Sequence, residues 1–351
     1  MRFEHETLPQ RVRFGAGEAR SGVRAEVERL GGARVLVIAA PSAATVARTV
    51  TADVPVVAHH TDVAMHVPLA TAERARAAAD RHAADVLVCV GGGSTTGLAK
   101  AVALTTGLPI VAVPTTYAGS EATRVWGITD GARKTTGVDT RVLPRAIVYD
   151  ATLTLTLPVG TSVASGLNAL AHCVDSMWAP RTDPLDQALA AEGIRALAAG
   201  LPAVVDDPVG PAGRERMLYG AYLSALAFSS AGSGLHHKIC HVLGGRYGAP
   251  HAETHAVVLP HVLAFNAPEA PDAERRIAAA LDAVSALAGL RRLRRTVHAP
   301  TALRDYGLTE ADVDDAVPAV LDAAPADNPR PVTADGVRKL LRAAWEGAEP
   351  V

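Results

Sequence analysis

Apolar residues follow two different patterns along the chain, and the change between them divides it in two. In the first half, short runs rich in valine, isoleucine and leucine alternate with alanine-rich segments of helical spacing. This alternation is typical of a parallel sheet covered by helices. The predicted strands occupy 34–40, 54–60, 85–90, 108–114 and 145–150, and the clearest predicted helices occupy 71–82 and 95–106.

From about residue 158 onward the apolar spacing is helical throughout. Proline and glycine fall between the helical segments, and no further strand is predicted. The boundary lies near 153–158, in the segment LTLTLP. We therefore expect an N-terminal α/β domain over 1–157 and an all-α C-terminal domain over 158–351.

Composition and charge narrow the class of protein. With 351 residues, 49% of them hydrophobic, the chain can bury two cores of ordinary size. Its 34 basic and 36 acidic residues create no overall field for nucleic acid or an anionic membrane. The three cysteines lack metal or disulfide spacing, and no stretch is apolar enough for a signal peptide or a charge-free membrane span. A cytoplasmic protein with neither kind of partner is expected.

A glycine-rich turn follows the predicted strand that ends at Val90. Gly91, Gly92, Gly93 and Ser94 lead into a helix predicted to open at Thr95. Glycines allow the backbone to approach a phosphate closely, and the first N–H groups of a helix complement its charge. The spacing is not the dinucleotide pattern G-x-G-x-x-G, and such turns also occur without a ligand. A second loop, 114–121, follows the next strand and offers hydroxyl groups to a ribose or nicotinamide.

Histidines gather between residues 234 and 255. His237 and His241 are four residues apart, as are Asn168 and His172, so on a helix each pair shares one face. Imidazole is the commonest physiological acid–base group and a frequent metal ligand. Together with His251, these residues predict a reaction centre.

These segments resemble a known family. The stretches 165–178 and 234–255, with 91–104, 114–123 and 328–333, resemble the iron-containing (group III) alcohol dehydrogenase superfamily, most closely its maleylacetate reductase subgroup. The resemblance runs over essentially the whole chain. It implies a dehydroquinate synthase-like architecture in which the N-terminal domain binds the dinucleotide.

The resemblance also implies a metal site, with one departure. Its ligand positions fall on Asn168, His172, His237 and His251, and the superfamily has an aspartate where this chain has Asn168. Divalent cations are held largely by anionic oxygen or imidazole. We therefore expect a vestigial site and no divalent metal, although three histidines can still bind zinc.

The implied activity is NAD(P)H-dependent reduction of the carbon–carbon double bond of maleylacetate to 3-oxoadipate, in the catabolism of aromatic compounds. No acidic residue follows the strand at 34–40 to exclude a 2′-phosphate, so either NADH or NADPH should serve. A homodimer acting on a small dicarboxylate is expected. The implied cofactor-binding residues are Gly92, Gly93, Ser94, Thr115, Thr116, Ser120, Thr123, Val125 and Lys134.

Without a metal, protein groups must stabilise the charge that develops as hydride arrives. We assign His241 as the proton donor or relay, and Lys238 and His237 as binders of a carboxylate or the developing enolate, with His236 as a further positive partner. Tyr117, in the second loop, is an additional candidate acid. His255 is expected to lie just outside this set.

Three other functions remain open. A metal-dependent (iron or zinc) alcohol or aldehyde dehydrogenase of the same fold would be indicated by stoichiometric metal in the purified protein. A glycerol-phosphate dehydrogenase-like or dehydroquinate synthase-like enzyme would be expected to keep the acidic ligand. A module that only binds a dinucleotide or a metal would leave the absorbance of NADH unchanged when substrate is added.

Overall fold

The computed structural model describes residues 2–131 and 133–350, which form two compact units. The sheet unit consists of Thr7–Leu157 and Val209–Leu218, and the helical unit of Met1–Glu6, Pro158–Pro208 and Tyr219–Val351. The expected division after residue 157 therefore differs from these units at two segments: Met1–Glu6 belongs to the helical unit, and Val209–Leu218 belongs to the sheet unit. The expected fold class, an α/β part followed by a helical part, is confirmed.

The sheet unit is built on six parallel strands, one in each of the five predicted segments and one more at the edge. That edge strand, β1 (Arg11–Phe14), has mostly exposed residues that alternate between arginine and an apolar residue, so hydrophobicity did not reveal it. The antiparallel hairpin β6 (Val125–Asp130) and β7 (Arg133–Val138) was also missed, because its residues are largely polar and exposed. The order across the sheet is β1 (Arg11–Phe14), β8 (Ala146–Tyr149), β5 (Ile110–Pro114), β4 (Val86–Gly91), β2 (Val35–Ile38) and β3 (Val56–His60).

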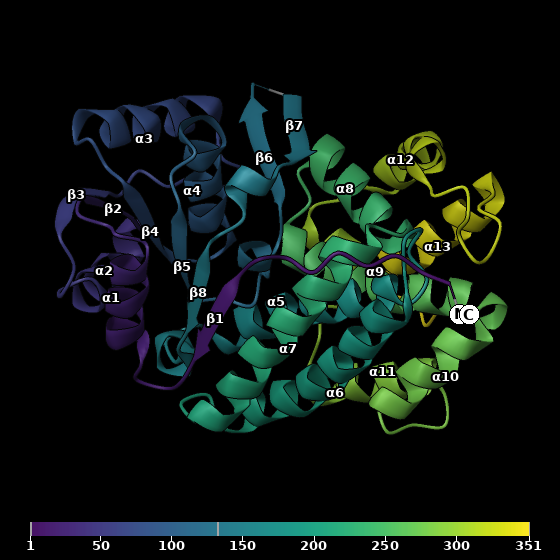
Figure 1. Cartoon of the computed structure of the whole chain (residues 1–351). Coiled ribbons are helices and arrows are strands. Elements are labelled where there is room, and N and C mark those ends of the chain that lie inside the picture. Colours follow the sequence, from purple (N-terminus) through teal and green to yellow (C-terminus); the bar gives the residue numbers. More distant parts are fainter. Residues whose placement is uncertain (1, 132, 351) are drawn as a thin grey trace. The chain divides into compact units, whose positions relative to one another are not determined.

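Helices cover both faces of this sheet (Figure 1). Along β2, Val35 and Val37 pack on the side of α1 (Ala19–Arg29) and α2 (Ala44–Val50). Leu36 and Ile38 pack on the side of α3 (Leu69–Arg81) and α4 (Gly93–Thr106). Because both faces are buried, the central strands appear in the sequence as continuous apolar runs.

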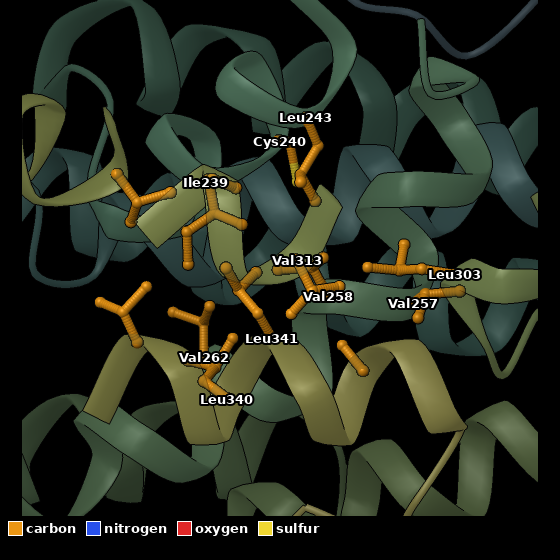
Figure 2. Close-up of a cluster of buried hydrophobic side chains, with 14 of the residues drawn as sticks. Ile239, Cys240, Leu243, Val257, Val258, Val262, Leu303, Val313, Leu340 and Leu341 are labelled. Carbon is orange, nitrogen blue, oxygen red and sulfur yellow. The ribbon is translucent and has the colours of Figure 1, made fainter. Parts of the chain in front are cut away.

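The helical unit has no strand among its described residues. Its core lies between α8 (Leu235–Tyr247), α9 (His251–Asn266), α12 (Glu310–Ala323) and α13 (Ala334–Glu346). Ile239 and Leu243 belong to this core together with Val258, Val313 and Leu341 (Figure 2). This core holds one side of α8 in a fixed position. Its other helices are α5 (Val159–Ser176), α6 (Pro184–Asp206), α10 (Pro271–Ala280) and α11 (Ala286–Thr296). The helix α7 (Pro211–Ala231) belongs to the sheet unit up to Leu218 and to the helical unit from Tyr219.

One helix, α6, is long and apolar enough by composition to cross a bilayer, with a mean hydropathy of 1.5 over its most apolar window. It contains Pro202 and the buried Asp186, and it packs against α5 and α10. A core helix of a globular protein has the same composition.

A buried carboxylate joins the edge strand β1 to the first helix. Glu26 of α1 is fully buried and accepts hydrogen bonds from Arg13 Nε at 2.7 Å and Arg29 Nε at 2.6 Å, with Arg11 Nε at 3.4 Å. Burial raises the pKa of Glu26, but the bonds from Arg29 and Arg13 outweigh it and hold that pKa below its ordinary value of 4.5. The carboxylate is therefore charged in the folded protein at neutral pH.

We expect Glu26→Gln to lower the free energy of unfolding by about 1–2 kcal/mol at neutral pH, less than a fully buried pair would lose because the arginines reach solvent. A lowered folded pKa gives stability that is complete above the unfolded pKa and is lost as the pH falls through the folded one. The difference between variant and wild type should therefore shrink in acid. Urea denaturation at pH 7 and about pH 3.5 measures it. The exposed Glu28→Gln should cause no measurable change, and an equal loss there would contradict the argument.

Candidate functional site

Three helices of the helical unit bring six histidines together. The rings of His172 and His237 stack nearly parallel with their centroids 4.9 Å apart, and the ring of His255 lies 4.8 Å from that of His237. The ring of His251 lies 4.4 Å from that of His255. We call this group the histidine cluster: His172 on α5, His236, His237 and His241 on α8, and His251 and His255 on α9.

Helical spacing accounts for the arrangement. Asn168, His172 and Asp175 of α5 are separated by four and three residues, which places them on one face. On α8, Ile239 and Leu243 enter the apolar core, so helical periodicity directs His237 toward another side. The predicted sharing of faces is therefore seen on both helices.

Asp175 fixes the orientation of His237. Its Oδ2 accepts hydrogen bonds from His237 Nδ1 at 2.7 Å and from the backbone N–H of Gly234 at 2.8 Å. Burial raises the pKa of Asp175 to about 7 and holds the pKa of His237 well below its ordinary value. When a neutral His237 keeps its proton on Nδ1 and donates a hydrogen bond from it to Asp175, its Nε2 atom carries a lone pair.

Gly234 makes this contact possible. A Cβ atom at position 234 would lie 2.4 Å from Asp175 Oδ1, which is far inside contact distance. The carboxylate therefore packs directly against the backbone that precedes α8. Sequence reasoning did not find Asp175, although its spacing of three from His172 was a usable signal.

Five buried polar atoms from α5 and α8 have no hydrogen-bond partner in the described part of the chain. They are Asn168 Oδ1, His172 Nδ1, Asp175 Oδ1, His236 Nδ1 and His237 Nε2. Buried polar atoms are nearly always paired in native proteins. These atoms therefore require a partner from outside the polypeptide, such as water or a bound molecule.

The donors at this site do not fit a divalent cation as they are arranged. Asn168 supplies a neutral oxygen, and the histidines at 172, 237 and 251 do not form a group with ligand atoms within 4.8 Å of one another. Among the described residues, two groups of three do so: His236 with Cys240 and His255, and His5 with Asp183 and Asp186. The set implied by the resemblance thus lacks both an anionic donor and close convergence.

The predicted catalytic side chains differ in accessibility. His241 and His251 are exposed and Lys238 is half-buried, whereas His237 is buried. The three accessible groups can therefore meet a solute. The ring of His241 lies 6.2 Å from that of His237, in an edge-on arrangement.

The sequence suggested that His255 lies just outside the predicted site, but the structure places it inside the histidine cluster. It is fully buried, and its Nδ1 is 2.8 Å from His236 Nε2. Burial lowers the pKa of both rings, to about 3 for His236. The spacing of four between His251 and His255 on α9 was the signal that sequence reasoning overlooked.

In the sheet unit, the two loops expected to hold the cofactor lie against each other. The backbone N–H of Thr115 donates to the carbonyl of Gly91 at 3.0 Å, and a Cβ on Gly92 would come within 3.0 Å of Thr116. Gly91 has φ 154°, which favours glycine. The helix α4 begins at Gly93, two residues before the expected start. The residues left partly exposed around its first turn are Gly92, Gly93, Ser94, Thr115 and Thr116.

A buried lysine holds the end of the second loop. Lys100 of α4 is fully buried, and its Nζ donates to Thr123 O at 2.8 Å, Thr123 Oγ1 at 2.9 Å and Val125 O at 2.8 Å. Burial lowers the pKa of Lys100 to about 7, while the nearby Glu121 opposes that change. Thr123 therefore anchors the loop through its own side chain.

The remaining residues of the sheet unit that were predicted to bind the cofactor differ in how exposed they are. Ser120 is partly exposed, the side chain of Val125 is exposed on β6, and Lys134 is exposed on β7 opposite Thr129. Tyr117 is fully buried, and its hydroxyl accepts a hydrogen bond from Arg214 Nη1 at 3.1 Å. A buried hydroxyl held in this way does not act as an accessible acid, so we assign Tyr117 to packing.

Comparison with known proteins gives a consistent family. Residues 9–151 match the model of iron-containing alcohol dehydrogenase, and residues 162–345 match the C-terminal model of the same family. A maleylacetate reductase of Sphingobium indicum is 43% identical, covering 100% of this chain and 99% of its own.

Two solved structures show the same fold over nearly the full length. An iron-containing alcohol dehydrogenase from Corynebacterium glutamicum has a TM-score of 0.97 and 58% identity, covering 98% of this chain and 97% of its own. A maleylacetate reductase from Agrobacterium tumefaciens has a TM-score of 0.95 and 39% identity, covering 100% of both chains.

We expect Gly234→Ala to destabilise the protein by about 2–3 kcal/mol, because the added Cβ must displace the buried carboxylate of Asp175. Gly245→Ala on the same helix is the matched control. A Cβ there meets no atom within 4 Å, so alanine should be neutral or slightly stabilising. Urea denaturation of both variants measures the difference. Equal stability of the two would show that the Asp175 contact is easily relieved.

Proposed function

This chain belongs to the iron-containing alcohol dehydrogenase family, and to the maleylacetate reductases within it, and we propose that it reduces the double bond of maleylacetate to 3-oxoadipate with NADH or NADPH. The reaction serves the breakdown of aromatic compounds. The observation that carries the proposal is the group of unpartnered polar atoms on the uncharged amide of Asn168 and on the imidazoles of His172 and His237, with the half-buried Lys238 following His237 on α8. An uncharged amide at position 168, in place of a carboxylate, suits a dianionic substrate.

The sheet unit supports dinucleotide binding. NAD(P)H supplies the hydride when bound. The partly exposed backbone of Gly92 and Gly93 at the start of α4 would hold its phosphates, since helix N-terminal N–H groups complement an anion. The hydroxyls of Thr115 and Thr116 would bind its sugar or amide groups. Lys100 keeps the second loop in place for this role through Thr123 and Val125.

The helical unit supports dicarboxylate binding. Lys238 is a half-buried cation on α8, and His241, three residues later, is exposed on the same helix. A charge-assisted bond from the Lys238 ammonium would hold one substrate carboxylate. Because His237 is neutral and donates its Nδ1 proton to Asp175, its Nε2 accepts a hydrogen bond and does not donate one to an anion. We therefore propose that Lys238 binds the carboxylate and that His237 orients a proton-bearing partner.

The proton needed by the reaction would come from His241. Hydride adds to one alkene carbon, the electron pair of the double bond moves toward the neighbouring ketone as an enolate, and a proton then completes the other carbon. An accessible imidazole is suited to this transfer near neutral pH. Asp175, through His237, acts as a positioning residue for the cluster.

We further propose that turnover needs no divalent metal, because the amide at Asn168 replaces the carboxylate of the inherited site. The alternative is a metal-dependent alcohol or aldehyde dehydrogenase. One observation favours it: the Asp175–His237 pair has the form of the carboxylate that orients a metal-bound histidine.

We propose that the protein is a cytoplasmic homodimer that binds neither nucleic acid nor membranes. In support, Cys89, Cys173 and Cys240 are free and buried, as expected for a reducing compartment.

We expect purified protein to oxidise NADH and NADPH with maleylacetate, at efficiencies within about tenfold of each other, and to retain this activity after exhaustive chelation. Absorbance at the reduced-nicotinamide band measures it. Asn168→Asp should gain zinc affinity by calorimetry, since a carboxylate adds charge attraction. Activity that disappears with chelator and returns with iron or zinc would favour the metal-dependent alternative.

Substitutions of Lys238 and His241 should have different kinetic effects. Lys238→Met removes a group that binds the substrate carboxylate in ground and transition states alike, so it should mainly raise KM. His241→Asn removes the acid and should lower kcat by roughly 10²–10⁴, with NADH affinity unchanged. Steady-state kinetics and NADH fluorescence titration separate these effects. His298→Asn, at an exposed histidine, is the matched control. A near wild-type kcat for His241→Asn would assign the proton to another group.

A further inference from the structure

A second group of ligand-type side chains lies where α6 begins. It consists of His5, Asp183 and Asp186, all within the helical unit. The imidazole nitrogen and one carboxylate oxygen from each aspartate lie within 4.8 Å of one another. None of the three belongs to the histidine cluster or to the cofactor loops.

Asp183 is held in position by the helix that it caps. Its Oδ1 accepts from the backbone N–H groups of Leu185 at 2.7 Å and Asp186 at 2.9 Å. Its Oδ2 is thereby directed to His5, with 2.7 Å between Oδ2 and Nδ1. The helix cap therefore presents a preoriented carboxylate oxygen to the N-terminal segment.

Asp186 is the unusual member of the group. It is fully buried, and neither of its carboxylate oxygens has a hydrogen-bond partner in the described part of the chain. The Ser230 side chain is near enough to lower the pKa of Asp186, and His5 Nδ1 is 3.9 Å from Oδ1. Burial, and then the charge of Asp183, raise the pKa of Asp186 to about 6. Two buried carboxylates therefore share one imidazole.

We propose that His5, Asp183 and Asp186 bind a divalent cation of the zinc class. One imidazole nitrogen and two carboxylate oxygens are typical zinc donors. Bonds of about 2.1 Å place the ligand atoms of a tetrahedral zinc site roughly 3.4 Å apart. The separations of 2.7 Å and 3.9 Å lie on either side of this value, so small side-chain shifts bring the donors to a common centre.

The charge and the accessibility of the group agree with a cation. Two carboxylates carry a charge that one divalent ion neutralises, whereas a protonated His5 offsets half of it. The side chain of His5 is 12% exposed, so water can reach the site and complete the coordination. A bound ion would fasten the segment before β1 to the first turn of α6. This site is independent of the proposed reductase chemistry.

The test uses chelator-stripped, full-length protein titrated with zinc chloride by calorimetry. Asp186→Asn keeps the side-chain shape and the Asp183 cap, and His5→Asn removes the imidazole. Wild type should bind one zinc ion that each variant binds at least about tenfold more weakly, because one of three protein ligands is lost. Zinc should also raise the melting temperature of wild type by about 3 °C, and neither variant should show this rise.

Asp80→Asn and His66→Asn, at exposed residues of the sheet unit, are matched controls and should bind zinc as wild type does. Zinc held elsewhere in the chain persists in every variant and is subtracted. Equal stoichiometry and affinity in wild type and Asp186→Asn would overturn the proposal. If Asp186→Asn does not fold, His5→Asn gives the same comparison at a residue outside the helices and strands.

Discussion

The histidine cluster depends on one buried hydrogen bond, from His237 Nδ1 to Asp175 Oδ2 at 2.7 Å. It joins α5 to α8 inside a core where an unpaired polar group is costly. It also decides which nitrogen of His237 carries the proton, and therefore whether the other nitrogen, Nε2, donates or accepts a hydrogen bond. The rest of the cluster is arranged around that ring, since His172, His236, His241 and His255 all lie in ring contact with it.

In the sheet unit, too, a buried polar side chain joins two segments, but there the side chain is a lysine. The ammonium of Lys100 takes the place of a carboxylate and ties α4 to the segment after the second loop through three hydrogen bonds. Tyr149 adds a bond from its hydroxyl to Glu121 Oε1 at 2.8 Å. In each unit, hydrogen bonds of buried polar groups therefore hold the segments on which the accessible residues lie: Lys100 holds the second loop, and Asp175 holds α8.

Asn168 is the residue at which the charge of this site differs from that implied by the family resemblance. An amide oxygen has nearly the shape of a carboxylate oxygen but no charge, so the change removes attraction for a cation and leaves the surrounding packing intact. The neutral imidazoles around it do not replace that charge, because burial lowers the pKa of His172 to about 3 and holds that of His237 below its ordinary value. The cations proposed to bind a dianionic substrate are therefore the half-buried Lys238 and the exposed His241 in its protonated form.

The sequence by itself determined five of the six strands of the parallel sheet and the fold class, an α/β part followed by a helical part, because both faces of the central strands are buried and hydrophobic periodicity records burial. It also determined the shared faces of 168 with 172 and of 237 with 241, because helical spacing is local. It did not reveal β1 or the hairpin, whose polar residues carry no such pattern.

Only the tertiary structure decided which polar residues meet. The partners of Lys100 lie 23 and 25 positions away along the chain, and Asp175 is 62 positions from His237. The interior position of Tyr117 and the place of His255 within the cluster were settled in the same way. Spacing along one helix predicts a common face, but pairing between distant elements depends on how their cores pack, which a single sequence does not display.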